Sequence, residues 1–253
     1  MILVQREFTV PPESKAEFER QSREGLWPTF LHFGAQMVAF GSWAFGDDSI
    51  PLVTHTAYED FAHWEATRGA SSLNAIKKTY SFYDDAEIMA ETEELRGTFA
   101  NRNALVTSSQ ACPFEVVMET PHPSPFYRRA GERLADLPPT FGRGSVVSER
   151  TLAIEDGTRE EFIRLSADVI WPWLESEGGR GIAIGQNLMG ASNELTTWFA
   201  FPTMARWYQC ARPASASAPA EVVDAYQKRH SFVRHQRGRV LLVGTDWGER
   251  PSA

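Results

Sequence analysis

Arg6 and Arg150 stand 144 residues apart, and each interrupts a stretch that is otherwise apolar and strand-like. A guanidinium in such a place needs a partner, because an unpaired buried charge is costly. One possible partner is the carboxylate or carbonyl of a bound molecule. Another is an acidic helix residue, in an ion pair at a sheet edge or an interface. The sequence leaves both alternatives open.

His55 is the strongest single candidate for acid–base chemistry. It lies in a predicted strand between Val53 and Tyr58, and an imidazole can exchange a proton or donate a hydrogen bond near neutral pH. Trp198 occupies the equivalent position of the second half, so at most one half would use this chemistry. The alternative is a core histidine whose hydrogen bonds are satisfied.

Tyr80 and His230 are a second candidate pair, because Tyr80-Ser-Phe matches His230-Ser-Phe. Both are expected at the end of the last helix of each half. A phenol and an imidazole can exchange protons or hydrogen-bond a ligand there. The alternative is a pair of surface residues at helix ends.

Many aromatic residues fall within the repeated regions. An aromatic-lined cavity suits a flat hydrophobic ligand, although core packing would explain the same residues. The candidates for substrate contact are Trp27, Trp43, Trp64, Trp171 and Trp198, together with Arg150.

Several familiar catalytic motifs are missing from the sequence. It contains no His-Glu-x-x-His zinc motif, no glycine-rich phosphate loop and no Gly-x-Ser-x-Gly nucleophile turn. Any catalysis is therefore expected to rely on His, Tyr and Arg without a dedicated metal or other cofactor. Haem remains an alternative, because one histidine suffices as its axial ligand.

These candidates belong to an internal duplication. Residues 6–46 and 150–190 align without a gap, and eleven of 41 positions are identical, including Trp27-Pro28 and Trp171-Pro172. A repeat of this length has the size of a small domain, so the chain contains two copies of one domain in tandem.

Each copy predicts the order β-α-β-β-α-α-β. Ser14 with Glu17, and Thr158 with Glu161, form capping boxes that should start the first helices. The proline after each Trp should kink or break the same helix. The closing strands are expected near 86–91 and 239–244, with a short extra strand near 114–119.

The predicted fold class is α+β, with two tandem ferredoxin-like domains. The first domain is expected to span residues 1–95 and the second residues 144–253. A proline-rich connecting segment, residues 96–143, would join them.

Composition narrows the functional classes. The 253 residues carry a net charge of −8 and no cluster of Lys and Arg, which argues against nucleic acid as a partner. Two cysteines provide no disulfide framework. No apolar run reaches about 18 residues, and no signal peptide is evident, so we expect a cytoplasmic protein without membrane contact.

Three segments resemble the NIPSNAP family. Residues 5–10 resemble its opening strand, residues 32–40 are similar to its His-Gly-Ala stretch, and residues 52–60 resemble its third strand. The second copy departs from the pattern at Trp198. The resemblance implies a dimeric α+β barrel, in which two ferredoxin-like sheets pack face to face. One tandem chain could supply both sheets, or two chains could pair, and a homo-oligomer is expected.

The resemblance implies several activities without choosing among them, since this superfamily includes monooxygenases, cyclases, isomerases, haem enzymes and ligand binders. We expect an enzyme acting on a small hydrophobic, aromatic substrate. His55, Arg6, Tyr80 and His230 are the catalytic candidates, for isomerisation, cyclisation, a lyase reaction or cofactor-free oxygenation. The alternatives are a ligand-binding or scaffold protein without catalysis, and a haem-binding protein.

Overall fold

The computed structural model describes residues 1–27, 35–45, 51–66, 97, 99–119, 142–213 and 217–244. The first half contains β1 (Ile2–Thr9), η1 (Pro12–Ser14), α1 (Lys15–Gln21), η2 (Ser22–Leu26), β2 (Gln36–Trp43), β3 (Leu52–Tyr58), α3 (Phe61–Ala66) and β4 (Ser108–Glu119). The second half contains β5 (Val146–Ile154), α6 (Arg159–Leu165), η4 (Ser166–Ile170), α7 (Trp171–Ser176), β6 (Arg180–Asn187), β7 (Glu194–Phe201), α8 (Met204–Cys210), α9 (Ala220–Ser231) and β8 (Val233–Val243). The second half therefore has the predicted element order.

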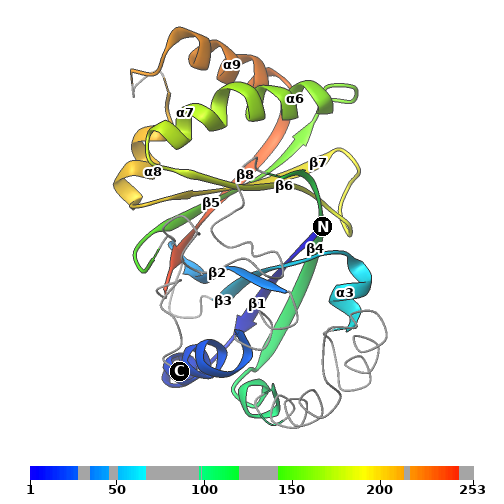
Figure 1. The fold of residues 1–253 in the computed structure, drawn as a ribbon, viewed down its shortest axis with the longest axis vertical. Helices are drawn as coiled ribbons and strands as arrows, with labels where there is room; N and C mark the ends of the chain where they lie inside the picture. Colours follow the sequence, from blue (N-terminus) through cyan, green and yellow to red (C-terminus); the bar gives the residue numbers. More distant parts are fainter. Residues whose placement is uncertain are drawn as a thin grey trace, which may run out of the picture.

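The strands form one closed barrel in the order β1-β3-β2-β8-β5-β7-β6-β4. Each half supplies four adjacent strands, and antiparallel pairs β2–β8 and β4–β6 join the two half-sheets. The helices of the second half lie beyond one side of the barrel, and α1 and α3 lie on the other (Figure 1). This arrangement confirms the predicted fold class and shows that a single chain supplies both sheets.

β4 lies inside the segment that was expected to connect the two copies. It pairs with β1 from Ile2 opposite Glu115 to Thr9 opposite Ser108, so it is longer than the short strand expected there. β8 pairs with β5 in the same way, because Cys112 faces Gln5 in one half and Arg239 faces Glu149 in the other. The strand expected at 86–91 lies outside the described residues.

This pairing changes one predicted equivalence. Cys112 and Arg239 occupy equivalent positions and are 127 residues apart. The same spacing makes Asn103 the first-half equivalent of His230. The match of Tyr80 with His230 is therefore wrong as a structural equivalence. It came from a short similar tripeptide, whereas the hydrogen-bonded strands fix the register.

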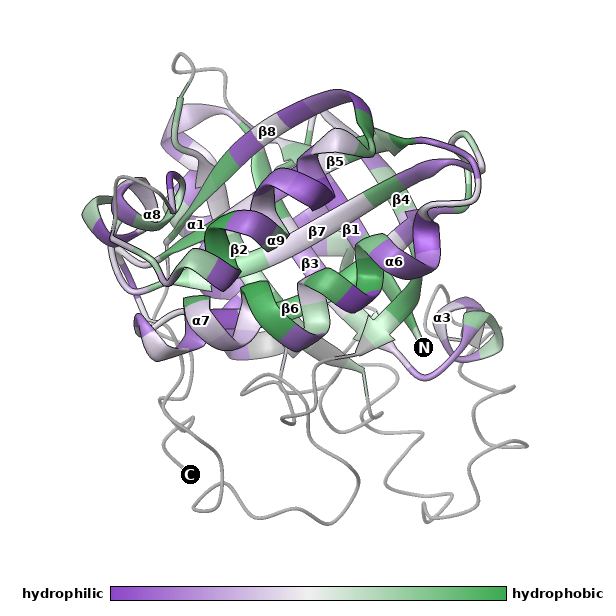
Figure 2. Ribbon diagram, turned by 90° about the horizontal axis from the view of Figure 1, so that it is seen from above, coloured by the Kyte–Doolittle hydropathy of each residue, from purple (hydrophilic) through white to green (hydrophobic). Residues whose placement is uncertain are grey.

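The side chains of each strand alternate between the barrel interior and the helices. The interior cluster draws on every strand and includes Leu3, Trp43 and Trp198. The outer faces of the two half-sheets pack on their own helices, around Phe18 in the first half and Phe162 in the second. In Figure 2, α6, α7 and α9 lie over β5, β6 and β7. Alternation thus separates residues that are neighbours in sequence.

The Trp-Pro helices contain a π-helical turn in both halves. The backbone N–H of Trp27 donates to the carbonyl of Ser22, and that of Trp171 donates to Ser166. Pro172 follows in the first turn of α7, where a missing N–H is tolerated. The disturbance that was predicted for the helix is therefore a widened turn directly before the proline. Such π-helical turns are frequent at functional sites.

The capping boxes do not form, although the helices begin where they predicted. Neither Ser14 nor Thr158 accepts a hydrogen bond at its cap, and the Thr158 hydroxyl donates to the carbonyl of Glu155 instead. Glu17 and Glu161 bond to arginines one turn later. Ion pairing thus replaces the expected reciprocal cap.

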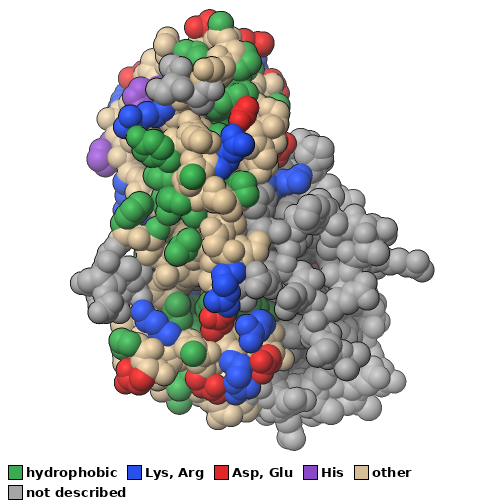
Figure 3. Space-filling view, turned by 90° about the vertical axis from the view of Figure 1, so that its left-hand side faces the viewer, with side chains coloured by type: hydrophobic (Ala, Val, Ile, Leu, Met, Phe, Trp, Pro, Cys, Tyr) green, Lys and Arg blue, Asp and Glu red, His purple; other side chains and the backbone are tan. Residues whose placement is uncertain are grey.

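Charges of both signs alternate along the surface of α1. Arg20 contacts Glu17 at 2.7 Å and Glu24 at 2.8 Å. Figure 3 shows blue and red side chains intermingled at the lower end of the face, where α1 lies. Within the described ranges, no helix combines the length and apolarity that crossing a membrane requires.

Candidate functional site

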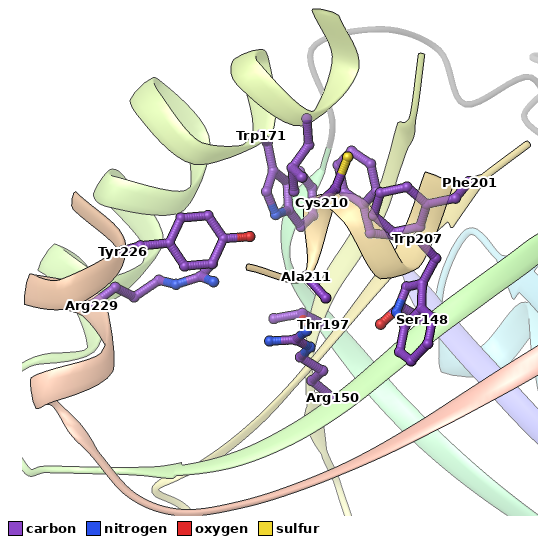
Figure 4. A pocket seen from close by; sticks show the side chains of 12 residues that line it. Ser148, Arg150, Trp171, Thr197, Phe201, Trp207, Cys210, Ala211, Tyr226 and Arg229 are labelled. Atoms are coloured by element: carbon purple, nitrogen blue, oxygen red, sulfur yellow. The ribbon is translucent and has the colours of Figure 1, made fainter. Parts of the chain in front are cut away.

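A pocket lies between the sheet of the second half and its helices (Figure 4). β5 and β7 form its floor, and α7, α8 and α9 contribute the other walls. Its enclosed volume is about 30 Å³, which is room for a carboxylate-sized group or a few waters. The lining residues are Ser148, Arg150, Trp171, Leu174, Thr197, Phe199, Phe201, Trp207, Cys210, Ala211, Tyr226 and Arg229.

Arg229 reaches the pocket from α9. Its Nη1 donates to the hydroxyl of Ser166 at 3.1 Å, and its guanidinium lies 5.3 Å from the ring centre of Phe162 and 4.9 Å from that of Tyr226. The Ser166 hydroxyl in turn donates to the carbonyl of Phe162. The π-helical turn therefore presents the oxygen that orients this guanidinium. Loss of water around Arg229 lowers its pKa, and the nearby Arg150 adds to this.

Arg150 approaches the same pocket from β5, on the outer face of the sheet. In Figure 4 its guanidinium and the Tyr226 hydroxyl lie toward the same space. Within the described part of the chain, no carboxylate lies within ion-pair distance of Arg150 or Arg229. Two cations beside an aromatic wall, without an anion of the protein, are suited to bind a negatively charged group.

Aromatic rings complete the pocket. Trp171 contacts Phe199 edge-on with ring centres 5.6 Å apart, and Phe199 lies 5.0 Å from Phe201. The Trp173 ring packs edge-on against the Tyr226 ring, with ring centres 6.4 Å apart. Such a wall favours a flat apolar body attached to the anionic group.

Arg6, the equivalent of Arg150, lines a different and larger cavity in the first half. That cavity has a volume of about 440 Å³ and is bordered by Phe8, Asn103 and polar residues of β4. Arg6 lies on the outer face of β1, beside the phenylalanine. The predicted combination of Arg6 with His55 is not brought together, since the sheet separates them.

His55 points into the barrel, where it meets residues of the other half. Its Nε2 is 3.6 Å from a carboxylate oxygen of Glu149, and its ring centre is 6.1 Å from that of Trp198. It is 2% exposed, and neither ring nitrogen has a hydrogen-bond partner in the described structure. It lines neither the second-half pocket nor the first-half cavity.

Glu149 is the centre of this interior network. It accepts hydrogen bonds from Trp198 at 3.0 Å and Arg239 at 2.7 Å, and Arg239 also bonds to Glu7 at 2.7 Å. Burial would raise the pKa of Glu149, but His55 and Arg239 outweigh burial and hold that pKa at about 2. Arg239 therefore joins acidic residues of both halves inside the barrel.

The remaining predicted residues are scattered. Trp27 packs in the helix-side core of the first half, 5.1 Å from Phe40, and Trp64 lies at the margin of that core. Trp43 lies under Arg239 at 3.8 Å inside the barrel. His230 is exposed on α9, and Tyr80 lies outside the described residues. Of the predicted contacts, Arg150 and Trp171 share one pocket, and Trp198 lies on the opposite face of the sheet.

Sequence reasoning missed Tyr226 and Arg229. The available signal was a second alignment at a spacing of 127, in which Arg102 matches Arg229 and Val106 matches Val233. It is short, and it follows a segment whose length differs between the two halves. For that reason the gapless repeat ended before reaching it.

Neither described cavity offers haem a histidine ligand. The histidines in the described ranges are His55, His63, His230 and His235, and none of them lines either cavity. Within the same ranges, no cluster of His, Cys, Asp or Glu could hold a metal ion. No described histidine is thus placed to hold haem in either cavity, whereas Cys210 and Tyr226 of the second-half pocket are residue types that can ligate it.

No family model matches the chain, and no curated protein does. A search of solved structures returns a "putative monooxygenase" from Lactobacillus acidophilus with a TM-score of 0.57 and 10% identity, covering 96% of this chain and 95% of that one. A protein of the same name from Fusobacterium nucleatum has a TM-score of 0.55 and 9% identity, covering 97% and 96%. The chain has the dimeric α+β barrel fold. A NIPSNAP family protein from Agrobacterium tumefaciens covers 43% of this chain and 93% of its own, with 14% identity and a TM-score of 0.35.

Proposed function

We propose that the protein is a small-molecule enzyme that binds an aromatic substrate through an acidic oxygen in the second-half pocket. The observation that carries this proposal is the pairing of Arg150 and Arg229 beside Tyr226, with no carboxylate of the described chain to neutralise them. A desolvated arginine with a second cation beside it is an unfavourable arrangement for an isolated protein. It becomes favourable once a bound anion lies between them.

The two arginines would stabilise negative charge on a substrate oxygen. When a ketone or phenol loses a proton, the charge collects on oxygen as an enolate or phenolate. Fixed cations in a site of low dielectric favour that form and lower the barrier to proton removal. This chemistry is common to isomerisation, cyclisation, dehydration and cofactor-free oxygenation of an aromatic anion.

Tyr226 is the candidate for moving the proton. Its hydroxyl faces the recess and its ring stacks against Arg229 at 4.9 Å. It would accept or return the substrate proton where the acidic oxygen enters the recess of about 30 Å³, while the flat body of the substrate would lie at the mouth of the pocket. His55 points into the barrel and does not line this pocket, so Tyr226 takes the role that was expected of His55.

The test begins with a ligand search by thermal shift. Small aromatic carboxylates, phenols and enolisable aromatic ketones are screened against the wild type and Arg150→Gln. For each ligand that binds, carbon-bound deuterium incorporation in D₂O is followed by mass spectrometry, and oxygen uptake is recorded in parallel. Arg164→Gln is the matched control, since Arg164 forms an exposed ion pair with Glu161 on α6.

We expect a ligand shift that Arg150→Gln abolishes and Arg164→Gln leaves intact. Tyr226→Phe should reduce the shift without abolishing it, and it should slow exchange or oxygen uptake by about 100-fold or more, as loss of a general acid–base group does. Binding that depends on Arg150 without any turnover would establish the alternative, a ligand-binding protein. Ligand shifts that are indifferent to Arg150 would refute the pocket itself.

A further inference from the structure

The first half contains an arginine whose setting repeats that of Arg229. Arg102 belongs to the helical residues 99–103 before β4, as Arg229 belongs to α9 before β8, and the two are 127 residues apart. Its Nη1 points at the Ser22 hydroxyl at 3.4 Å, and Ser22 donates to the carbonyl of Phe18. The serine again comes from the π-helical turn.

The guanidinium of Arg102 is enclosed by aromatic rings. It lies 5.0 Å from the ring centre of Phe8, 4.8 Å from that of Phe18 and 5.9 Å from that of Phe99. The residue is 4% exposed, and its Nε has no hydrogen-bond partner in the described structure. Among the described residues, no carboxylate forms an ion pair with it. A buried cation with a spare donor is costly unless something else supplies an acceptor.

The electrostatics agree with the geometry. Burial lowers the pKa of Arg102 to about 9, and the positive charge of Arg6 contributes to the decrease. Arg102 is still cationic at neutral pH. Cation–π contacts with the three rings offset only part of its desolvation. An anion near Arg6 and Arg102 would relieve both the burial and the mutual repulsion.

A cavity lies next to this group, although Arg102 itself does not line it. Arg6 and Phe8 line the cavity of about 440 Å³, and the Phe8 ring also stacks on Arg102. Hydroxyl and amide side chains of β4, including Ser108, Ser109 and Gln110, form much of the remaining wall. The cavity is therefore more polar than its counterpart in the second half.

We propose that the first half holds a second anion-binding site in the cavity lined by Arg6, with the charge of Arg102 next to the Phe8 wall supporting it, for a small carboxylate with a polar or aromatic body. The chain would then bind two anions, one in each half. Phe99 stands where the second half has Tyr226, so the first-half site has no equivalent hydroxyl for proton transfer. It binds without catalysing the chemistry proposed for the second half, and it does not depend on that proposal.

The probe is 4-bromobenzoate. Crystals of the full chain grown with it are expected to show bromine anomalous peaks at two places, one beside Arg6 and Arg102 and one beside Arg150 and Arg229. Isothermal titration should give two equivalents for the wild type and one for Arg102→Met. Arg229→Met should also give one, with the peak in the first half retained.

Controls separate the site from general charge and from misfolding. Arg20→Gln removes an exposed, ion-paired arginine of the same half and should leave two equivalents. Arg102→Lys keeps a positive charge among the rings and should retain the site. Circular dichroism of every variant verifies the fold.

The proposal is overturned if Arg102→Met keeps both equivalents, or if the wild type shows only the second-half peak or none. A bromine peak distant from Arg102 would show adventitious binding only and would also overturn it. Any of these outcomes that retains the second-half peak leaves the proposed function standing. That function fails separately, when the second-half peak and the Arg150-dependent thermal shift are missing.

Discussion

The two halves of the barrel share one construction on their helix sides and differ in the barrel interior. On the helix side, Arg102 and Arg229 each contact a π-turn serine and a phenylalanine of the first helix. In the interior, one layer contains Gln5, His55 and Cys112 from the first half, and Glu149, Trp198 and Arg239 from the second. None of the three equivalent interior pairs retains its residue type.

This difference shows which features a fused dimer must keep. The helix side of each half packs within that half, so nothing compels the two copies to diverge there. The interior is shared, and equivalent positions contact each other across it, as His55 and Trp198 do at 6.1 Å. In a tandem chain the interior position of one copy can be acidic, as Glu149 is, and the equivalent position of the other copy neutral, as Gln5 is. Only the two side chains together must fit the shared interior. His55 and Trp198 therefore belong to one shared core, and their difference does not distinguish two separate pockets.

The seams where the half-sheets join give the largest expected difference between equivalent residues. A Cβ at Gly41 would overlap the backbone carbonyl of Leu242, whereas one at Gly185 would meet the Trp198 ring at 3.0 Å and the Phe114 Cβ at 3.1 Å. The backbone of β8 can move only by opening the seam with β2, which has three paired residues. Gly41→Ala should lower the free energy of unfolding by about 3 kcal/mol or more, and Gly185→Ala by about 1–2.

Urea unfolding of both variants measures this order. A Gly185→Ala loss equal to or above that of Gly41→Ala would mean that the two seams are equally tolerant. The barrel would then not depend on close backbone approach at β2 and β8.

Glu149 against Gln5 tests the interior layer. The pKa of Glu149 is about 2 in the folded chain against an ordinary 4.5, so its ionisation stabilises the fold fully above pH 4.5, and this contribution is lost as the pH falls toward 2. A shift of this size corresponds to about 3 kcal/mol. Glu149→Gln should lower the unfolding free energy at pH 7 by about that amount and flatten its dependence on pH in this window.

The matched change in the first half is Gln5→Met. Gln5 donates one hydrogen bond to Glu7, and its oxygen is buried without a partner in the described structure. Its replacement should change stability by about 1 kcal/mol or less, with no effect on the acid limb. Guanidinium unfolding at a series of pH values compares the two, and an unaltered acid limb in Glu149→Gln would contradict the network.

The sequence predicted the architecture because the repeat carries it. The gapless alignment of residues 6–46 with 150–190 indicated the element order. The alternation of side chains within each strand indicated the two faces of the sheet. It did not predict the equivalence of β4 and β8. β4 lies in a proline-rich segment, and the two strands are 127 residues apart, whereas the gapless repeat has a spacing of 144. It also placed Arg6 and His55 in one site, since two positions on neighbouring strands say nothing about faces until the register is known. Arg150 and Trp171 were found because each lies inside the gapless repeat.

Removing the buried cations should stabilise the chain, more in the first half than in the second. Arg102 is 4% exposed with a long 3.4 Å contact to Ser22, whereas the partly buried Arg229 bonds Ser166 at 3.1 Å. Methionine keeps the packing between the rings without the desolvated charge. In buffer without carboxylate, sulfate or phosphate, we expect Arg102→Met to gain about 1 kcal/mol and Arg229→Met less.

Calorimetry with and without 4-bromobenzoate checks both the sign and its cause. Arg20→Met, on the surface, should change neither value. A clear loss of stability in ligand-free Arg102→Met would show that the ring cage stabilises the cation by itself, and the contrast with Arg229 would disappear.

The smallest effect belongs to a single oxygen. Phe99 and Tyr226 are equivalent, and each ring lies against the arginine of its half, at 5.9 Å and 4.9 Å. Tyr226→Phe removes the hydroxyl from the second half, and Phe99→Tyr adds one to the first, so the double exchange conserves composition and swaps only the place of the oxygen. Each change should alter the unfolding free energy by less than about 0.5 kcal/mol. A hydrogen bond to a charged ligand contributes about 1.5–3 kcal/mol, so the affinity of the second half for 4-bromobenzoate should fall about 10-fold or more. If the hydroxyl is what makes the second half reactive, proton exchange should move to the first half in the double variant. If proton exchange stays in the second half of the double variant, the difference lies in the apolar wall of Trp171 and Phe199 instead.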